Sequence, residues 1–412
     1  MNILIIGGGA REHALAATFA KEDATIWVAP GNAGIAKEFQ CLPLSGNSDI
    51  LNWCREHRPD LVVVGPEQPL AEGLADLLDA AGIACLGPSQ AAARIESSKV
   101  FAKELMAGLG IPTAAYNTFP NPEQALQWLR FNNGFPVVIK ADPLAAGKGV
   151  FVVHDEEQAR NAMQSITTQL GKECPVLVEE YLQGWEVSLF AITDGLAFCT
   201  TPFVQDYKQL GDGDTGPNTG GMGAVCPIWE AEVHRKRISH EIIGPMLKAL
   251  RDQGCPFRGF LYCGLMITPR GPKVLEFNCR LGDPEAQVLL PLLTTPLTTI
   301  CAAVLQGGVE DLKIEWNQQH SVCVVLASHG YPGNYTVGHP IQVGDDVSSR
   351  VFYGGVAQHN GQLSTQGGRV LSLVSLATDL PTARWQVYSD TALINFEGKT
   401  MRKDIGLRAN QT

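Results

Sequence analysis

Three polar side chains with complementary chemistry alternate along one short run of the sequence. Residues 274–280 read VLEFNCR, and an extended chain would send Glu276, Asn278 and Arg280 to one face. The apolar residues between them are expected on the opposite face: Leu275, Phe277 and Cys279. Carboxylate and carboxamide oxygens suit a hard cation such as Mg²⁺, and a guanidinium suits a phosphate or carboxylate beside it. A half-exposed strand explains the same alternation, but the polar run 281–287 that follows favours a metal–nucleotide site.

The composition indicates an ordinary globular protein of more than one domain. At 412 residues the chain is too long for one core, and 45% hydrophobic with 18% charged residues excludes disordered and fibrous classes. The net charge of -11 argues against a nucleic-acid or membrane-surface role, since both need a basic face. Eleven cysteines without a C-x-x-C pair indicate free thiols. We expect a cytoplasmic monomer without a signal peptide, a membrane span or a nucleic-acid partner.

The first hundred residues repeat a strand, a glycine turn and a helix. The expected strands are short and apolar and end in Gly/Pro-rich turns: 3–6, 26–29, 61–64 and 83–86. Such a repeat predicts a Rossmann-like parallel sheet that binds ligands at the carboxyl ends of its strands. We expect this N-terminal α/β domain to span 1–100, and a helix over 90–109 to follow the last strand.

Two further domains are expected, a middle domain over 101–310 and a small α+β domain over 311–412. The middle domain should contain a unit over 117–187, with a helix over 122–131 and strands over 136–140, 150–153 and 176–180. The uncharged stretch 286–309 contains two prolines and is expected to be a buried helical region rather than a membrane span.

The first glycine turn has a ligand-binding and a structural interpretation. Gly7-x-Gly9-x-x-Glu12 is close to a dinucleotide fingerprint, but glutamate stands where the third glycine is usual. Such a turn would place backbone N–H groups near a phosphate, with Arg11 and His13 beside it. A plain tight turn is the alternative.

Two more patterns would fit a nucleotide but have ordinary alternatives. The segment 145–149, AAGKG, lacks P-loop spacing and would suit a flap over phosphates, with Lys140 as a fixed cation; a solvated loop is the alternative. Glu179, Glu180 and Glu186 would accept ribose hydroxyls, or would simply lie at the surface.

The loop 205–224 is more specific. It contains six glycines, three aspartates and only two long apolar side chains, Leu210 and Met222. The loop has little apolar surface to bury, and so little to offset the conformational entropy that it would lose on becoming ordered. A disordered linker is therefore one interpretation. Because it lies between apolar strands of a compact chain, we expect a functional loop instead.

Taken together, these segments resemble the glycinamide ribonucleotide synthetase family of ATP-grasp ligases. The matching pieces keep the family's order along the chain: GGGAREHALA, VAPGNAG, VVGPEQPL, VIKADPLAAGKGV, GDGDTGPNTGGMGA, FRGFLYCGLM, EFNCRLGDPEAQ, GYPGNY, GGRVL and RKDIG. The resemblance implies a preATP-grasp N-terminal domain, an ATP-grasp core with a mobile lid over about 117–187, and a small C-terminal domain. Four residues depart from the family pattern: Pro143, Trp185, Tyr207 and Gln209.

The resemblance also implies residue roles. Glu276 and Asn278 would hold Mg²⁺ (or Mn²⁺) on the ATP phosphates. The residues implied to bind ATP are Lys99, Lys140, Gly147, Lys148, Gly149, Glu179, Glu180 and Glu186. Those implied to line the glycine and acyl-phosphate site are Arg280, Asp206, Lys208, Thr219, Gly220, Gly221, Met222 and Gly223. Those implied to bind phosphoribosylamine are Gly9, Arg11, Glu12, His13, Asn32, Gly34, Pro66 and Glu67.

The implied activity is the ATP-dependent ligation of glycine to 5-phosphoribosylamine through glycyl phosphate, a step of de novo purine biosynthesis. One rival is another ATP-grasp ligase with a different carboxylate or amine substrate. A second is an NAD-dependent oxidoreductase built on the Gly7 turn, which leaves Glu276, Asn278 and the glycine-rich loop without a purpose. A third is a nucleotide sensor that binds ATP without turnover.

Overall fold

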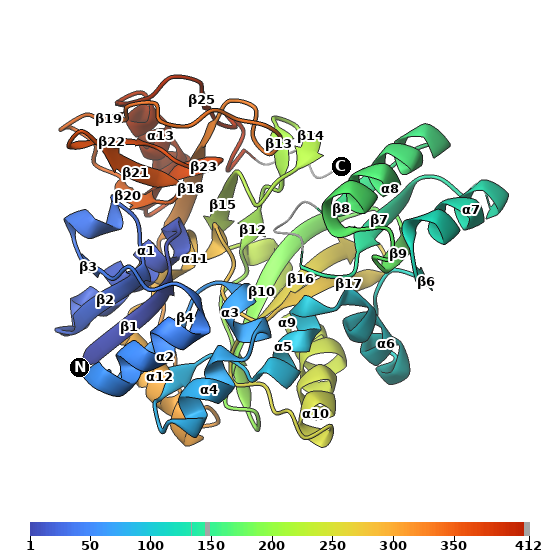
Figure 1. Ribbon diagram of the computed structural model, residues 1–412, viewed down its shortest axis with the longest axis horizontal. Coiled ribbons are helices and arrows are strands. Elements are labelled where there is room, and N and C mark those ends of the chain that lie inside the picture. Colours follow the sequence, from blue (N-terminus) through green and yellow to red (C-terminus); the bar gives the residue numbers. More distant parts are fainter. Residues whose placement is uncertain (133, 145–148, 408–412) are drawn as a thin grey trace.

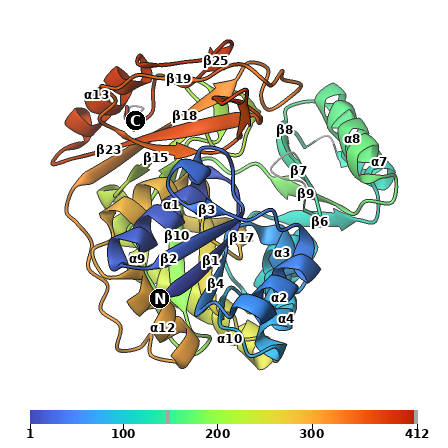
Figure 2. The same cartoon turned by 60° about the vertical axis from the view of Figure 1, so that its left-hand side comes forward.

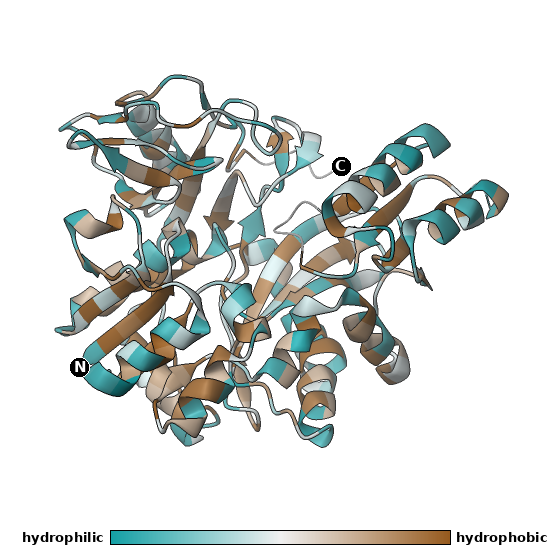
Figure 3. Cartoon of the chain, in the orientation of Figure 1, coloured by the Kyte–Doolittle hydropathy of each residue, from teal (hydrophilic) through white to brown (hydrophobic). Residues whose placement is uncertain are grey.

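A computed structural model describes residues 1–132, 134–144 and 149–407. The N-terminal region is a parallel sheet in the order β3-β2-β1-β4-β5, as the repeat of strands and glycine turns predicted (Figure 1). Its strands are β1 (Asn2–Gly7), β2 (Thr25–Pro30), β3 (Gln40–Cys41), β4 (Leu61–Val64) and β5 (Cys85–Leu86). Its helices are α1 (Ala10–Phe19), α2 (Gly46–His57), α3 (Glu67–Ala71), α4 (Leu74–Ala80) and α5 (Gln90–Ser97). Strand β1 is apolar along its length because both faces of the sheet are covered (Figure 3).

A second unit has its own small core and projects from the side of the molecule (Figure 2). Its antiparallel sheet has the order β6-β9-β7-β8. The strands are β6 (Tyr116–Phe119), β7 (Val137–Ala141), β8 (Val150–Val153) and β9 (Val176–Glu180). Helices α7 (Pro122–Asn132) and α8 (Glu156–Leu170) cover one face, and their apolar sides form the core with the strands. The elements predicted in this stretch agree with the structure to within a residue or so.

The central sheet has the order β11-β10-β16-β17 and is antiparallel. Its strands are β10 (Trp185–Thr193), β11 (Phe198–Thr200), β16 (Gly259–Thr268) and β17 (Gly271–Asn278). The helices around it are α6 (Lys99–Leu109), α9 (Arg235–Ile238), the π-helix η4 (Ser239–Ile243), α10 (Gly244–Asp252), α11 (Glu285–Leu289) and α12 (Leu297–Gln306). The last two fill the uncharged stretch that was predicted as buried helix. No helix among the described residues has the length and apolar character needed to cross a membrane.

The C-terminal region is built on a sheet that also recruits strands from the middle of the chain. Its order is β12-β15-β18-β23-β20, with β25 paired to β18. The strands are β12 (Gln205–Asp206), β15 (Gly223–Cys226), β18 (His320–Ser328), β20 (Arg350–Tyr353), β23 (Arg369–Ala377) and β25 (Lys399–Thr400), and α13 (Leu380–Thr391) packs on them. Two-stranded pairs complete the region: β13 (Gln209–Gly211) with β14 (Thr215–Asn218), β19 (Gln342–Val343) with β24 (Ile394–Asn395), and β21 (Val356–His359) with β22 (Gln362–Thr365). The domain boundaries expected at 100 and 310 stay predictions.

The helix predicted over 90–109 is two helices that meet at Ser98. This residue has extended backbone angles, φ -134° and ψ 109°, and its hydroxyl accepts a hydrogen bond from the Phe101 N–H at 3.2 Å. Ser98 is therefore the N-cap of α6, and the second helix starts in a new direction. The break sets Lys99 at the first position of α6.

Candidate active site

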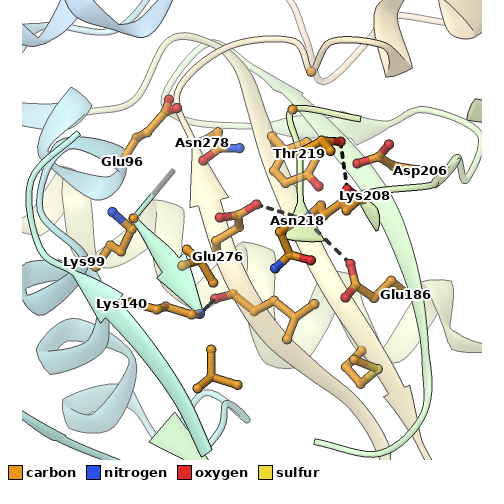
Figure 4. A pocket seen from close by; sticks show the side chains of 18 of the residues that line it. Glu96, Lys99, Lys140, Glu186, Asp206, Lys208, Asn218, Thr219, Glu276 and Asn278 are labelled. Carbon is orange, nitrogen blue, oxygen red and sulfur yellow. Dashed lines mark hydrogen bonds and ion pairs between the residues drawn. The ribbon is translucent and has the colours of Figure 1, made fainter. Parts of the chain in front are cut away.

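One cavity of about 460 Å³ lies between the N-terminal sheet, the projecting unit, the central sheet and the C-terminal sheet. It collects residues that the sequence assigned to three separate ligands. The predicted residues that line it are Arg11, Pro66, Glu67, Lys99, Lys140, Gly149, Glu179, Glu180, Glu186, Asp206, Lys208, Thr219, Gly220, Glu276, Asn278 and Arg280. Lys99 and Lys140 lie on one side, Lys208 and Glu186 on the other, and Glu276 with Asn278 between them (Figure 4).

Strand β17 presents its polar residues to the cavity, but not with the strict alternation that the sequence predicted. A bulge opposite Gly264 and Leu265 of β16 leaves one extra residue in β17. Leu275 was expected in the interior with Phe277; it lines the cavity instead, next to Glu276. Val274 is fully buried in its place. The prediction for Leu275 was wrong because the bulge turns two successive residues to the same side.

Glu276 lies in a network of alternating charges. Its carboxylate is 3.1 Å from the Lys208 ammonium, which is also 3.6 Å from Glu186 (Figure 4). Burial alone would raise the pKa of Glu276, but the cations Lys208 and Lys140 lower it to about 2. Burial likewise opposes the charge on Lys208, yet Glu276 and Glu186 hold its pKa well above the ordinary range. Both partners are therefore ionised at neutral pH.

Two lysines from different elements reach the other side of the cavity. Lys140, near the end of β7, donates to the backbone oxygen of Leu275 at 2.9 Å and pairs with Glu179 at 3.0 Å. Lys99 donates to the backbone oxygens of Asp142 and Pro143 at 3.2 and 3.3 Å. Burial lowers the pKa of Lys99, and the charge of Glu276 opposes this shift. This is a positive wall of the kind that polyphosphate binding requires.

Lys103 was missed from the sequence although it belongs to the same group. Its ammonium is buried and lies 3.2 Å from the Glu179 carboxylate, and burial lowers its pKa to about 8. One helical turn separates it from Lys99, so both lie on the same face of α6. That spacing of four residues was the available signal.

Glu179 and Glu180, which are adjacent, have different surroundings. Glu179 is buried between Lys103 and Lys140, and among the described residues its Oε1 atom has no hydrogen-bond partner. Glu180 is exposed and pairs with Lys273 at 3.1 Å. A buried acceptor with one oxygen unmatched needs an explanation, because such groups are costly. A donor group on a ligand in the cavity would supply the missing partner.

Arg280 faces the N-terminal region rather than the glycine-rich loop. Its guanidinium is 2.7 Å from Glu96 and 3.3 Å from Glu67, and Glu96 also accepts from the Cys279 N–H at 2.7 Å. Burial raises the pKa of Glu96, although the positive charge of Arg280 opposes this shift. Arg11 joins the same corner by donating to the Leu281 oxygen at 3.1 Å. Glu96 was also missed by the sequence analysis, since nothing near it in sequence marks it.

Glu12, which stands where a third fingerprint glycine is usual, lies below the turn and does not line the cavity. Its carboxylate accepts the Gly9 N–H and the Arg11 Nε–H, each at 2.6 Å. A Cβ atom at Gly65 would lie 2.0 Å from Glu12 Oε1, and one at Gly7 would lie 2.6 Å from Glu12 Cδ. Glycine at these two positions therefore makes room for the glutamate, which braces the turn.

Three more residues assigned to phosphoribosylamine, His13, Asn32 and Gly34, contact the end of β20 or the residue that follows it. The Asn32 amide donates to the backbone oxygens of Tyr353 and Gly354 at 2.9 and 3.0 Å. His13 Nδ1 accepts the Tyr353 N–H at 3.0 Å, and a Cβ at Gly34 would lie 2.1 Å from the Tyr353 ring. Gly9 also does not line the cavity. We infer that His13, Asn32 and Gly34 join the N- and C-terminal regions.

The glycine-rich loop lines the cavity with residues on either side of its exposed hairpin, Asp206 and Lys208 before it and 218–220 after it, while its C-terminal end is buried. Thr219 donates from both its N–H and its hydroxyl to the Lys208 oxygen at 2.7 Å, so the two residues face the cavity together. Gly221, Met222 and Gly223 do not line it. Met222 is fully buried, and a Cβ at Gly221 would lie 2.4 Å from Pro284. The sequence analysis missed five cavity residues near this loop: Asn218, Tyr262, Asp283, Glu285 and Arg369.

Asp206 is the one of the loop's three aspartates that lines the cavity. Burial raises its pKa well above the ordinary range, and the nearby Glu285 adds to the shift. Its Oδ1 atom is buried and has no hydrogen-bond partner within the described part of the chain. Asp206 is thus suited to hold or accept a proton. Gly147 and Lys148, assigned to the flap, lie outside the described residues.

Glu276 and Asn278 fit a divalent cation as a partial ligand set. One anionic and one neutral oxygen from adjacent positions on the same face leave most of an octahedron for phosphate oxygens and water, as Mg²⁺ commonly requires. Among the described residues there is no cluster of three or more His, Cys, Asp or Glu side chains that would form a complete protein cage. The donor set therefore suits a metal that arrives with a nucleotide.

Comparison with known protein families covers nearly the whole chain. The N, ATP-grasp (A) and C domain models of phosphoribosylglycinamide synthetase match residues 1–96, 97–286 and 321–408. Phosphoribosylamine–glycine ligases from Caldanaerobacter subterraneus and Rhizobium meliloti are 41% and 43% identical. The alignments cover 98% and 99% of this chain and 99% of each relative.

Solved structures indicate the same family. The phosphoribosylamine–glycine ligase of Thermotoga maritima is 36% identical, with a TM-score of 0.85 over 98% of this chain and all of that one. A biotin carboxylase of Campylobacter jejuni shares the fold at 17% identity, with a TM-score of 0.71 over 98% of this chain and 94% of that one. The chain therefore belongs to the phosphoribosylglycinamide synthetase family of ATP-grasp ligases.

Proposed function

We propose that the chain joins glycine to 5-phosphoribosylamine at the expense of ATP, through a glycyl phosphate intermediate, in purine biosynthesis. The observation that carries this proposal is the single cavity in which Lys99 and Lys140, the pair Glu276 and Asn278, and the Lys208 loop face one another. The relatives with matching length are named for this ligation. We infer that three ligands share one cavity because a reactive intermediate must pass between them.

The first step is the attack of the glycine carboxylate on the γ-phosphorus of ATP, which forms glycyl phosphate and releases ADP. An anion attacks a polyanion here, so positive groups must offset their repulsion. Lys99 and Lys140 are placed to bind ATP phosphates, and Lys208 to bind the carboxylate. Glu276 and Asn278 would hold Mg²⁺ or Mn²⁺, which would supply further charge neutralisation to the phosphate oxygens.

The second step is the attack of the amine of 5-phosphoribosylamine on the acyl carbon of glycyl phosphate. An amide bond forms, inorganic phosphate leaves, and the amine gives up one proton. Asp206, which is buried and has an unmatched oxygen, is suited to receive that proton. Arg11 and Glu67 border the opposite end of the cavity and would contact the phosphoribosyl group.

The projecting unit suits the role of a lid. It has its own core and supplies Lys140, Gly149 and Glu179 to one wall of the cavity. An acyl phosphate hydrolyses readily in water, so a lid that excludes solvent would protect it. The free oxygen of Glu179 lies on this wall, and we propose that it accepts a hydrogen bond from the adenine amino group of ATP.

The deciding experiment is an ADP-release assay with single and combined substrates. Turnover that requires glycine and phosphoribosylamine together supports the proposal. Bicarbonate-dependent turnover without glycine would instead indicate a carboxylase on the same fold. A cytoplasmic location and a monomeric state also remain predictions.

A further inference from the structure

The loop 205–224 has almost no apolar side chains to hold it in place. Fixing each residue in one conformation costs conformational entropy, so the glycine-rich loop needs stabilising contacts from outside itself. Figure 1 shows its hairpin, β13 and β14, beside the orange-red C-terminal region. Three short segments of the C-terminal region contact this loop.

The first segment is 402–406, RKDIG, which holds the hairpin. Arg402 is 1% exposed and donates to the Gln209 oxygen at 3.0 Å and to the Asp214 carboxylate at 2.8 Å. Its other edge binds Asp404, with distances of 2.8 and 2.6 Å. Asp404 in turn accepts the Gly213 N–H at 2.8 Å. A buried arginine that binds the hairpin on one edge, and on the other an aspartate that itself accepts from the hairpin, is a strong local restraint.

The same segment contacts two residues that depart from the family pattern, Tyr207 through its side chain and Gln209 through its backbone. The Tyr207 hydroxyl accepts the Gly406 N–H at 3.1 Å, and the Arg402 guanidinium lies over the Tyr207 ring, 4.9 Å from its centroid. Gln209 contributes its backbone oxygen to Arg402. The Tyr207 side chain therefore contacts the C-terminal segment, and neither Tyr207 nor Gln209 lines the cavity.

The other two segments hold the far end of the loop. The Tyr331 hydroxyl accepts the Gly220 N–H at 2.9 Å. Arg369 donates to the Gly220 oxygen and to the Asp283 oxygen, both at 2.6 Å. A Cβ atom at Gly220 would lie 2.9 Å from the Arg369 guanidinium carbon, so glycine permits this close approach.

Lys208 lies between the two restrained ends. Its backbone oxygen accepts both hydrogen bonds from Thr219, next to Gly220, and Gln209 follows it in the chain. Its ammonium reaches Glu276 across the cavity. Movement of either end of the loop would therefore change the distance between Lys208 and the strand that carries Glu276.

We propose that the C-terminal region is a positioning element for the glycine-rich loop, and that Arg402 and Tyr331 are positioning residues that hold Lys208 against the cavity. The proposal deepens the function proposed above, because it assigns the fixed loop to glycine binding. It makes two separable claims, one about loop order and one about glycine affinity.

Loop order is tested by hydrogen exchange in the full-length protein. Arg402→Gln and Tyr331→Phe should speed exchange of amides in 205–224 by about ten- to hundredfold, the effect of losing one or two charged or buried hydrogen bonds. Asp214→Asn provides a third variant at an exposed hairpin tip, in case Arg402→Gln fails to fold. Two matched controls should leave this exchange unchanged. Tyr335→Phe alters the neighbouring ring, 6.3 Å away, and Arg130→Gln alters an arginine of the projecting unit that pairs with Glu156.

Glycine affinity is tested by steady-state kinetics on the same variants. The glycine KM should rise about tenfold in Tyr331→Phe and Asp214→Asn, while the ATP KM changes by less than about twofold. Arg402→Lys should raise the glycine KM less than Arg402→Gln does, since lysine keeps the positive charge but not the forked geometry of arginine.

The two measurements refute different claims. Unchanged exchange in 205–224 for folded Tyr331→Phe and Asp214→Asn overturns the positioning role, whatever the enzyme's substrate. Faster exchange with equal rises in the glycine and ATP KM values overturns the assignment of the loop to glycine. Wild-type turnover without glycine would refute the proposed function itself, and the exchange arm would still decide whether the C-terminal region orders the loop.

Discussion

Replacement of Glu276 by glutamine tests the centre of the proposed site. The change keeps the size of the side chain and removes one negative charge, 3.1 Å from Lys208. Loss of an anionic ligand for the metal should remove several kcal/mol of charge stabilisation from phosphoryl transfer. At about 1.4 kcal/mol per decade, turnover should fall by roughly a thousandfold or more.

The same substitution has a calculable effect on stability. The pKa of Glu276 is lowered from 4.5 to about 2, which corresponds to roughly 3 kcal/mol at about 1.4 kcal/mol per pKa unit. Its side chain is 32% exposed, and solvent screening reduces the expected value to about 1–3 kcal/mol. Because the folded-state pKa lies below the unfolded one, this contribution is present above about pH 4.5 and disappears as the pH falls through 2. Glu276→Gln should therefore be less stable than the wild type at pH 7.

The assay combines ADP release at saturating substrates with urea unfolding at pH 7. Glu232→Gln is the matched control, because Glu232 is also ion-paired, at 2.6 Å, and 34% exposed, but lies away from the cavity. The reasoning fails if folded Glu276→Gln turns over at the wild-type rate, or if Glu232→Gln loses as much activity. If Glu276→Gln unfolds, Asn278→Ala tests the metal assignment by the same assay.

Three other perturbations test separate parts of the structure. Lys208→Met leaves Glu276 and Glu186 without their shared cation, so ADP release should fall by about a hundredfold, the usual scale for one electrostatic group; a rate near wild type would contradict the role of this lysine. Asn32→Ala removes donors to the C-terminal sheet and should lower the free energy of unfolding by about 1–3 kcal/mol in urea, with the phosphoribosylamine KM unchanged; a large rise in that KM would favour the substrate role that the sequence implied. The His13 hydrogen bond and the Arg350 charge lower the pKa of Glu38 to about 2, so Glu38 stabilises the fold above about pH 4.5 and this is lost toward pH 2. In urea titrations, the free energy of unfolding of Glu38→Gln should thus fall less than that of the wild type between pH 5 and 2, by about 1 kcal/mol after solvent screening. Equal falls would argue against the pairing of Glu38 with His13 and Arg350.

Much of the site was predictable because its signals are local. Glu276 and Asn278 are two residues apart on a strand, so both reach the same side whatever surrounds them. The parallel sheet was predicted from short apolar strands that end in glycine turns, a pattern set by burial and by the need for tight turns. The glycine content of the loop excluded an apolar core and indicated a functional loop.

Other features depended on neighbours that no local pattern specifies. Leu275 faces the cavity because β16 imposes a bulge on β17. Glu96 and Arg280 meet across a separation of 184 residues, and Asn32 reaches Gly354 across 322. In each case the contact depends on how elements far apart in the sequence pack against each other.

The amino-acid sequence by itself determined the chemistry of this protein: which oxygens, ammonium groups and glycines are present, and which of them share a strand or a turn. Only the tertiary structure decided which charges pair and which motif residues reach the cavity. It also decided that Asn32 and His13 join regions of the chain, that Arg369 lines the cavity, and that Lys103 pairs with Glu179 in the cavity wall. The physical reason is that backbone periodicity acts over a few residues, whereas ion pairs and buried hydrogen bonds depend on where folded elements meet.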